Sequence, residues 1–350
     1  MYHFIVSLFV LFPFIAFTQV NKKITFSGYT EAYYAWDSDK PANHERANFI
    51  YNHKRHNELN INLALAKINY IDTFVRANAG VMVGNYAQYN LANEPTLFQS
   101  IYEANVGFKI SKNNNTWVDI GILPSHIGFE SAIGADCWTA SRSIATDNSP
   151  YFETGIKLTH TNSKENFYYS FLVLNGWQRI QKPNGTQMPS LGMQFNYKPT
   201  NAITLNYSNF IGTDKPDSAK ALRTYHNLYF ILEKPRISIT AGLDIGSDKY
   251  TSTTYGLWYS PVIIARTSIY SRSKIAARIE YFNDKKQVLI PTNTINGFQT
   301  TGFSINYDYT IYKKITFRLE GKAYLSTNKI FNNNTRTTNY SILSSICCKW

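Results

Sequence analysis

Long hydrophobic stretches are scarce in this sequence. A helical membrane protein needs segments of about 20 apolar residues, and no segment beyond residue 20 meets that requirement. The sequence therefore lacks the pattern of a helical membrane protein. A transmembrane β-barrel remains compatible with it, because the lipid-facing side of a barrel strand uses only every second residue.

Cysteine is also scarce, with three residues in the whole chain. Cys347 and Cys348 are neighbours, so their side chains point to opposite faces of one strand and cannot form an ordinary disulfide. No cysteine stands in a lipobox near the N-terminus. We interpret the cysteines as structural and expect neither a disulfide framework nor a lipoprotein anchor.

The sequence also lacks the motifs of metal binding, phosphate binding and hydrolysis. The seven histidines lack the i, i+4 or Cys-paired spacing of a metal site, and no Gly-rich phosphate loop is present. Ser125, His126 and Glu130 lie close in sequence, but neighbours on an extended chain point apart, which argues against a hydrolase. The net charge of +12 is scattered, without the basic arm or helix that nucleic-acid binding would favour. We expect no enzyme, no cofactor, no metal and no nucleic acid.

The first residues form an apolar segment from Phe4 to Phe17. Ala16 and Thr18 occupy the −3 and −1 positions of a cleavage site before Gln19, which is typical of a secretory signal peptide. The segment has no Lys or Arg before its apolar part, so a buried helix is the alternative. We predict a signal peptide at residues 1–18 and a mature barrel at residues 19–350.

Aromatic residues are abundant, with 26 Tyr and 22 Phe. They alternate with polar residues: in the segment 303–310 every odd residue is apolar or aromatic and every even residue is polar. The segment 315–325 repeats this pattern. A period of two indicates a strand with water on one side. A soluble sandwich would show the same alternation, so these two segments leave the environment open.

The number and spacing of such segments favour a closed transmembrane barrel. The same alternation predicts sixteen antiparallel strands, with fourteen to eighteen as the range, at residues 24–37, 56–69, 72–85, 100–111, 115–123, 151–162, 165–177, 188–198, 201–212, 222–233, 236–247, 253–270, 274–284, 298–310, 315–327 and 338–350. The connections alternate between short and long, as in outer-membrane barrels with short periplasmic turns and long extracellular loops. Sandwiches and propellers have no reason to keep this rhythm.

Three segments resemble a known family. They are Phe26–Tyr34 (FSGYTEAYY), Gly121–Glu130 (GILPSHIGFE) and Ala277–Asp284 (ARIEYFND). Together they are similar to the putative β-barrel porin-2 family, also called OmpL-like porins, over most of the mature chain. The resemblance implies an outer-membrane pore of a Gram-negative bacterium, with no catalytic residues to carry over.

Residue parity along the predicted strands places charged side chains inside the barrel, where they would line a water-filled lumen. The bases are Arg76, Lys109, Lys157, Arg223, Arg266, Arg278, Arg318 and Lys322, and the acids are Glu31, Glu103, Asp119, Glu153, Glu280, Asp308 and Glu320. Rings of charge set pore selectivity. Salt bridges that only stiffen the wall are the alternative, so a mild anion preference stands as a hypothesis.

The segment 124–150 is the longest connection, and we expect it to fold into the lumen as a constriction. Its candidate residues are His126, Glu130, Trp138 and Arg142; an exposed surface loop is the alternative. The polar connection from Asp37 to Arg55 is expected to lie outside.

Aromatic residues recur at the predicted strand ends, and Tyr and Trp suit the headgroup level of a bilayer. We therefore predict aromatic girdles that include Trp36, Tyr70, Trp117, Trp177, Tyr197, Tyr259, Tyr309 and Trp350. The final strand keeps apolar residues at even positions, and its terminal Trp350 resembles the signal by which barrel-assembly machinery recognises its substrates.

We hold two functional hypotheses. The first is a porin that lets small hydrophilic solutes or ions diffuse across the bacterial outer membrane, in contact with its lipid and with a homotrimer as one assembly. The second is a structural or adhesive barrel that acts through its surface loops. The chain is too short for a TonB-dependent transporter of 22 strands and a plug.

Overall fold

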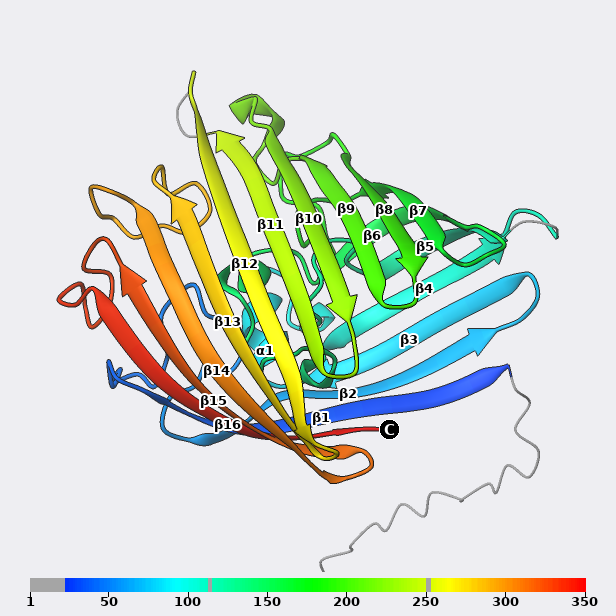
Figure 1. Cartoon of the computed structure of the whole chain (residues 1–350). Helices are drawn as coiled ribbons and strands as arrows, with labels where there is room; N and C mark the ends of the chain where they lie inside the picture. Colours follow the sequence, from blue (N-terminus) through cyan, green and yellow to red (C-terminus); the bar gives the residue numbers. More distant parts are fainter. Residues whose placement is uncertain (1–22, 113–114, 250–252) are drawn as a thin grey trace, which may run out of the picture.

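The computed structural model of the protein describes residues 23–112, 115–249 and 253–350 (Figure 1). The predicted signal peptide lies outside these residues. The described chain is almost entirely β-structure, and its strands stand side by side around a single closed ring.

Within the described residues, sixteen antiparallel strands form this barrel. Each strand pairs with its neighbours in sequence, and the first strand closes the ring against the last, with Tyr29 opposite Lys349 and Asp37 opposite Ser341. The strands are β1 (Ile24–Asp37), β2 (Leu59–Ile71), β3 (Val75–Val83), β4 (Ile101–Lys109), β5 (Asn115–Pro124), β6 (Phe152–Thr161), β7 (Phe167–Leu174), β8 (Ser190–Thr200), β9 (Ile203–Gly212), β10 (Arg223–Glu233), β11 (Ile237–Lys249), β12 (Tyr255–Tyr270), β13 (Ser273–Asp284), β14 (Phe298–Tyr312), β15 (Ile315–Ser326) and β16 (Thr338–Lys349).

The predicted fold class is therefore confirmed, and most predicted strand boundaries lie within three residues of the observed ones. Strand β3 is shorter than predicted because Gly84 ends it. Gly84 has a φ of 122°, and a Cβ atom there would lie 2.6 Å from the carbonyl oxygen of Asn62. The chain turns at this glycine into the short helix α1 (Asn85–Asn90).

Alternation along the strands separates two faces. In β12, Leu257, Tyr259 and Ile263 are exposed on the outer surface, whereas Trp258 and Ser260 are buried inside. Exposed apolar side chains on the outside of a closed barrel suit hydrocarbon, and closure leaves no strand edge with unpaired backbone groups. None of the helices in the described part of the chain is long and apolar enough to cross a membrane.

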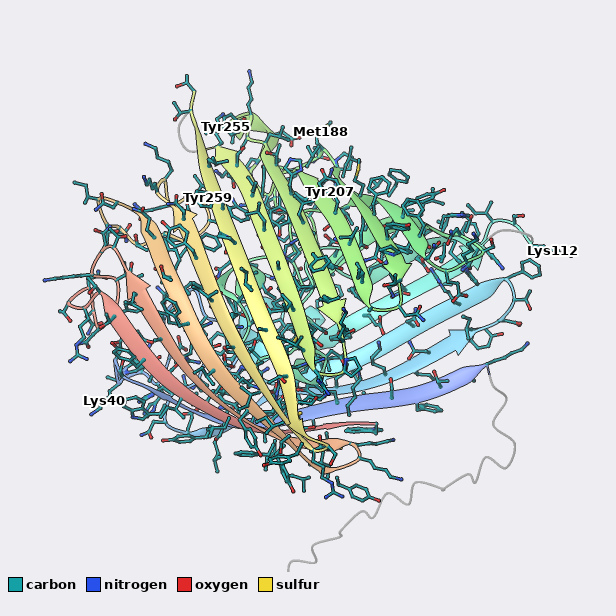
Figure 2. The ribbon with its side chains drawn as sticks, viewed as in Figure 1. Lys40, Lys112, Met188, Tyr207, Tyr255 and Tyr259 are labelled. Carbon is teal, nitrogen blue, oxygen red and sulfur yellow. The ribbon has the colours of Figure 1, made fainter. Side chains whose placement is uncertain are left out.

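The connections at one end of the barrel are short, at residues 72–74, 110–114, 162–166, 201–202, 234–236, 271–272 and 313–314. Most connections at the other end are much longer, and the five-residue link 250–254 is the exception. Figure 2 shows the two ends on opposite sides of the molecule, with Lys40 of a long connection far from Lys112 of a short turn. We call these the long-loop end and the short-turn end.

The connection from Asp37 to Arg55, which corresponds to the observed connection 38–58, was expected to lie outside, and this expectation is wrong. Phe49 and Ile50 are buried, and Phe49 packs edge-to-face against the inward rings of Phe298 and Tyr324. The buried Asn52 donates a hydrogen bond to Asp147 at 2.7 Å. The segment folds inward because its apolar pair has a core to join and its polar groups find partners there.

The prediction of aromatic girdles needs one correction. Trp350, Tyr197, Tyr259 and Tyr309 are exposed on the outer side, but Trp117 and Trp177 are buried. Trp177 packs against the inward rings of Phe210 and Tyr225, with ring centroids 5.0 Å apart in both pairs. These two tryptophans belong to the interior of the barrel.

Candidate pore and its inserted loop

The connection between β5 and β6, residues 125–151, lies against the inner wall of the barrel. It contains the 3-10 turn η2 (Gly134–Asp136) and the short helix α2 (Ile144–Asp147). The backbone N–H of Ala140 donates to Asn306 on β14 at 3.0 Å, and that of Ile144 donates to Glu280 on β13 at 2.6 Å. We call residues 125–151 the inserted loop.

A buried ionic cluster holds the inserted loop to β13 and β15. Arg278 lies 3.5 Å from Glu130 of the loop, 3.5 Å from Glu280 and 3.1 Å from Glu320. Lys322 pairs with Glu280 at 2.8 Å and also donates to the carbonyl oxygen of Arg142 at 3.0 Å. These side chains are almost fully buried, so each charge depends on its partners in the cluster.

A second set of contacts holds the middle of the inserted loop, around residues 134–137. Arg318 on β15 donates to the carbonyl oxygens of Gly134 and Cys137 at 2.7 and 2.9 Å. It also pairs with Asp308 on β14 at 2.8 Å. Within the loop, Arg142 donates to the carbonyl oxygens of Ser131, Ala132 and Ala140 and thereby ties its two limbs together.

These contacts correct part of the predicted pore lining. Parity placed Arg278, Glu280, Arg318, Glu320 and Lys322 on the inner face, and there they do contact the loop. They do not line open water, because the inserted loop covers them. The observed contacts of these five residues match the alternative interpretation, which was a network of salt bridges that stiffens the wall.

His126, at the start of the inserted loop, bridges two strands on one side of the barrel. Its Nδ1 lies 2.8 Å from Glu153 on β6, and its Nε2 lies 2.7 Å from the carbonyl oxygen of Asn209 on β9. A carbonyl oxygen only accepts, so Nε2 must donate to it. The ring lies against Gly192 on β8, where a Cβ atom would come within 2.7 Å of it. His126 is therefore a strut between β6 and β9, which are three strands apart in the ring.

Inward charges on the wall formed by β2 to β6 keep some exposure. Arg76 pairs with Asp119 at 2.5 Å, and Lys67 pairs with Glu103 at 2.7 Å. The bases are 27% and 21% exposed, whereas their carboxylates are 3% and 4% exposed. The positive groups thus cover the negative ones. Sequence reasoning had not singled out Lys67, although parity along β2 would have found it.

Lys109 on β4 and Lys157 on β6 belong to the same wall and are partly buried. Lys109 lies 6.0 Å from the centre of the Trp117 ring, and Arg76 stacks over the same ring at 4.5 Å. Trp117 therefore supports two bases by cation–π contact.

Arg223 and Arg266 stand on β10 and β12. Arg223 pairs with Asp248 at 2.6 Å and stacks over Trp177 at 4.9 Å. Arg266 lies 3.3 Å from Glu233 and 4.4 Å from the ring centre of Trp138, which belongs to the inserted loop. Trp138 thus contacts the inner wall opposite β2 to β6.

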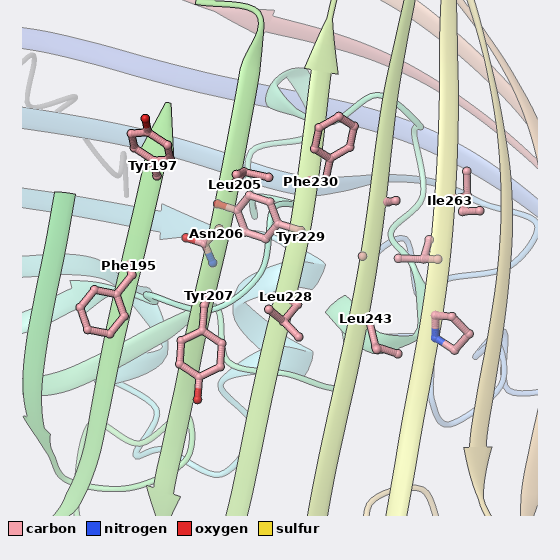
Figure 3. Close-up of a pocket in the computed structure, with 14 residues that line it drawn as sticks. Phe195, Tyr197, Leu205, Asn206, Tyr207, Leu228, Tyr229, Phe230, Leu243 and Ile263 are labelled. Carbon is pink, nitrogen blue, oxygen red and sulfur yellow. The ribbon is translucent and has the colours of Figure 1, made fainter. Parts of the chain in front are cut away.

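The large hollow in Figure 3 is a different feature. It has a volume of about 640 Å³ and is lined mainly by apolar side chains of β8 to β12, including the exposed Leu205, Leu228 and Ile263. Because these residues point outward, the hollow is a groove in the outer surface of the barrel. It does not belong to the lumen.

A closed sixteen-strand barrel with an apolar outer surface, a charged interior and an inserted loop is the architecture of an outer-membrane porin. The family comparison agrees: residues 23–349 match the family described as putative beta-barrel porin-2, OmpL-like. The chain belongs to this family and is a porin of the bacterial outer membrane. This match confirms the family that the three sequence segments predicted.

Solved structures give the same fold. The anion-selective porin from Comamonas acidovorans superposes with a TM-score of 0.62 at 9% identity, over 93% of this chain and 99% of that one. The outer membrane channel DcaP of Acinetobacter baumannii gives 0.62 at 8% identity, over 93% and 97%. Salmonella typhi OmpF, solved in complex with daunomycin, gives 0.60 at 10% identity, over 93% and 97%. At this identity the likeness concerns the fold alone. The search of curated proteins returned no match.

Proposed function

We propose that this porin is a passive diffusion channel for small hydrophilic solutes with a preference for anions. The inserted loop narrows its lumen and is anchored on β13 to β15, whereas Lys67 and Arg76 on the β2 to β6 wall keep partial exposure. The short turns face the periplasm and the long connections face the outside, which is the usual orientation of such barrels.

The observation that carries this proposal is the layering of charge on the β2 to β6 wall. Inward acids and bases nearly balance in number, so a simple count predicts little selectivity. Burial breaks that balance. A passing ion meets the exposed ammonium of Lys67 and guanidinium of Arg76 before it meets the carboxylates beneath them. Charged side chains that line a pore set its ion selectivity, so the wall should attract anions.

The reversal potential in a planar bilayer under a KCl gradient tests the preference. We expect a chloride-selective sign for the folded protein. In the Lys67→Gln/Arg76→Gln variant the exposed charge disappears while two buried acids remain, so selectivity should move toward potassium. Lys164→Gln/Lys198→Gln removes two bases elsewhere and is the matched control. A cation preference of the unmodified channel would contradict the proposal.

The rival function is a structural or adhesive barrel that works through its surface loops. The inward folding of segments 38–58 and 125–151 weighs against it, because two of the longest connections are committed to the interior. Step currents of correctly folded protein support a channel. Complete electrical silence of the same protein favours the rival.

Several partners are part of the proposal. The exposed apolar outer surface suits outer-membrane lipid, and Trp350 would present the C-terminal strand to barrel-assembly machinery. A homotrimer is a further expectation; OmpT of Vibrio cholerae, which shares the fold, has been described in a trimer form. Cleavage of residues 1–18 can be checked by N-terminal sequencing of protein from outer membranes.

A further inference from the structure

A hollow at the short-turn end combines several bases with few acids. It lies between the turn at residues 234–236 and the turn at residues 271–272, has a volume of about 350 Å³, and is lined by Glu233, Lys234, Pro235, Arg236, Ser238, Arg266, Thr267, Ser268 and Lys274. Four of these nine residues are bases and one is an acid. We call this hollow the rim pocket.

Strand register explains why these groups converge. On the paired strands β11 and β12, Ser238 stands opposite Arg266. On β12 and β13, Ser268 stands opposite Lys274. Opposite residues of an antiparallel pair share one face of the sheet. The face is the inner one, since the buried Ser238 and Ile264 belong to the same alternation.

The charges in the rim pocket are largely unneutralised. Glu233 pairs with Arg266 at 3.3 Å, and Arg266 is further held over Trp138. Among the described residues, Lys234, Arg236 and Lys274 form no ion pair. Asp308 stands opposite Lys274 on β14, but Arg318 occupies it at 2.8 Å. Three bases therefore remain available to a ligand.

We propose that the rim pocket binds a phosphate group or a similar multivalent oxyanion. Guanidinium groups present paired N–H donors that match phosphate oxygens, and lysine adds mobile positive charge. The hydroxyl group of Ser268 adds a further donor. A multivalent anion neutralises more of this positive charge than a monovalent one and is therefore the better match.

Two sources could supply such a group. A phosphorylated small solute could reach the rim pocket from the lumen, and an anionic phospholipid could place its headgroup there from the membrane. The first source rests on the proposed channel function, whereas binding itself does not. Both share the phosphate chemistry that the pocket selects.

The test is a titration of inorganic phosphate, followed by ³¹P line broadening, with the full chain in phosphatidylcholine nanodiscs. The lipid phosphate gives a separate signal. We expect saturable broadening that weakens about tenfold in the Arg236→Gln/Lys274→Gln variant, because each lost charged contact removes a sizeable share of the binding free energy. The Lys164→Gln/Lys198→Gln control loses the same charge elsewhere and should bind as the unmodified protein does.

The outcomes separate clearly. Equal phosphate binding by both double variants, or broadening that never saturates, overturns the proposal. Weaker phosphate binding in nanodiscs containing phosphatidylglycerol supports it and assigns the pocket to lipid headgroups, whereas equal binding in the two lipids supports it and assigns the pocket to solutes. The substituted residues are exposed, and heat-modifiable migration confirms a folded barrel. Conductance in phosphate-free KCl reports separately on the channel function.

Discussion

The cluster around Arg278 offers the sharpest test of how the inserted loop is held. In Arg278→Met, the three carboxylates of Glu130, Glu280 and Glu320 lose a shared buried cation. Hydrogen bonds from Arg278 to Thr139 and Ser141 of the loop are lost as well. The barrel ladder itself does not depend on these contacts, so the effect should fall on the loop.

The magnitude follows from burial. Removing one partner of a buried ion pair costs about 3 to 5 kcal/mol. Lys322 remains at 2.8 Å from Glu280, so we take the lower end of this range. A loss of about 3 kcal/mol shifts the equilibrium between docked and undocked loop by roughly a hundredfold. The loop should then leave the wall for a measurable fraction of the time.

Single-channel recording in planar bilayers measures this fraction. We expect larger and noisier conductance steps for Arg278→Met and unchanged steps for Arg272→Met, which removes an exposed arginine from the adjacent short turn. The double variant Arg278→Met/Glu320→Gln should show less than the sum of the two single effects, because it removes both charges of one contact. Unaltered conductance and noise in a folded Arg278→Met barrel would refute the reasoning.

Three further predictions concern other contacts. His126→Ala removes two buried hydrogen bonds and should lower the free energy of unfolding by about 1 to 3 kcal/mol. The measurement is the denaturant-dependent loss of heat-modifiable migration, and His44→Ala, at an exposed histidine, is the control. Burial lowers the pKa of Lys54 to about 8, below its unfolded value of 10.5, so the charge of Lys54 opposes folding below pH 8. Docking of segment 38–58 should therefore strengthen as the pH rises from 8 to 10.5, which protection from proteolysis measures. Lys54→Met should abolish that rise. Gly192→Ala should loosen the same strut as His126→Ala without changing its chemistry, because the added methyl group meets the imidazole ring; unchanged stability in this variant would count against the strut.

The strands could be predicted because the bilayer imposes one simple rule on them. Lipid outside and polar contacts inside enforce a period of two, and the printed sequence shows it clearly in β14 and β15. The end of β3 could not be predicted in the same way, because only the close approach of Gly84 to the carbonyl oxygen of Asn62 explains why the strand ends there.

Residue parity predicts which face of the sheet a side chain occupies, but it does not predict how buried the side chain is. It placed Lys322 and Arg76 on the same inner surface, yet the inserted loop covers the first and leaves the second partly exposed. Trp117 shows the reverse case. Its position near a strand end favoured a girdle, but it has the same parity as Asp119, and consistent use of parity would have placed it inside.

Residue parity does not apply to long connections, and their mostly polar composition does not reveal the few residues that are buried in the interior. Segment 38–58 is mostly polar, yet Phe49 and Ile50 pack into the interior core and Asn52 finds a polar partner there. Small residues in the inserted loop act in a similar way: Ala140 is fully buried between the loop and the wall, and its N–H reaches Asn306. Such contacts join residues far apart in sequence, so no local pattern reveals them.

The two halves of the interior therefore serve different purposes. On β13 and β15, carboxylates and bases neutralise one another beneath the loop and contribute little to the field in the lumen. On β2 to β6, Lys67 and Arg76 keep partial exposure, whereas the carboxylates that pair with them are buried. On the proposed function, docking of the loop would therefore both narrow the pore and keep a balanced set of charges out of contact with solutes. If the loop undocks in Arg278→Met, Glu280 and Glu320 become accessible, and the wider channel should also be less selective for anions.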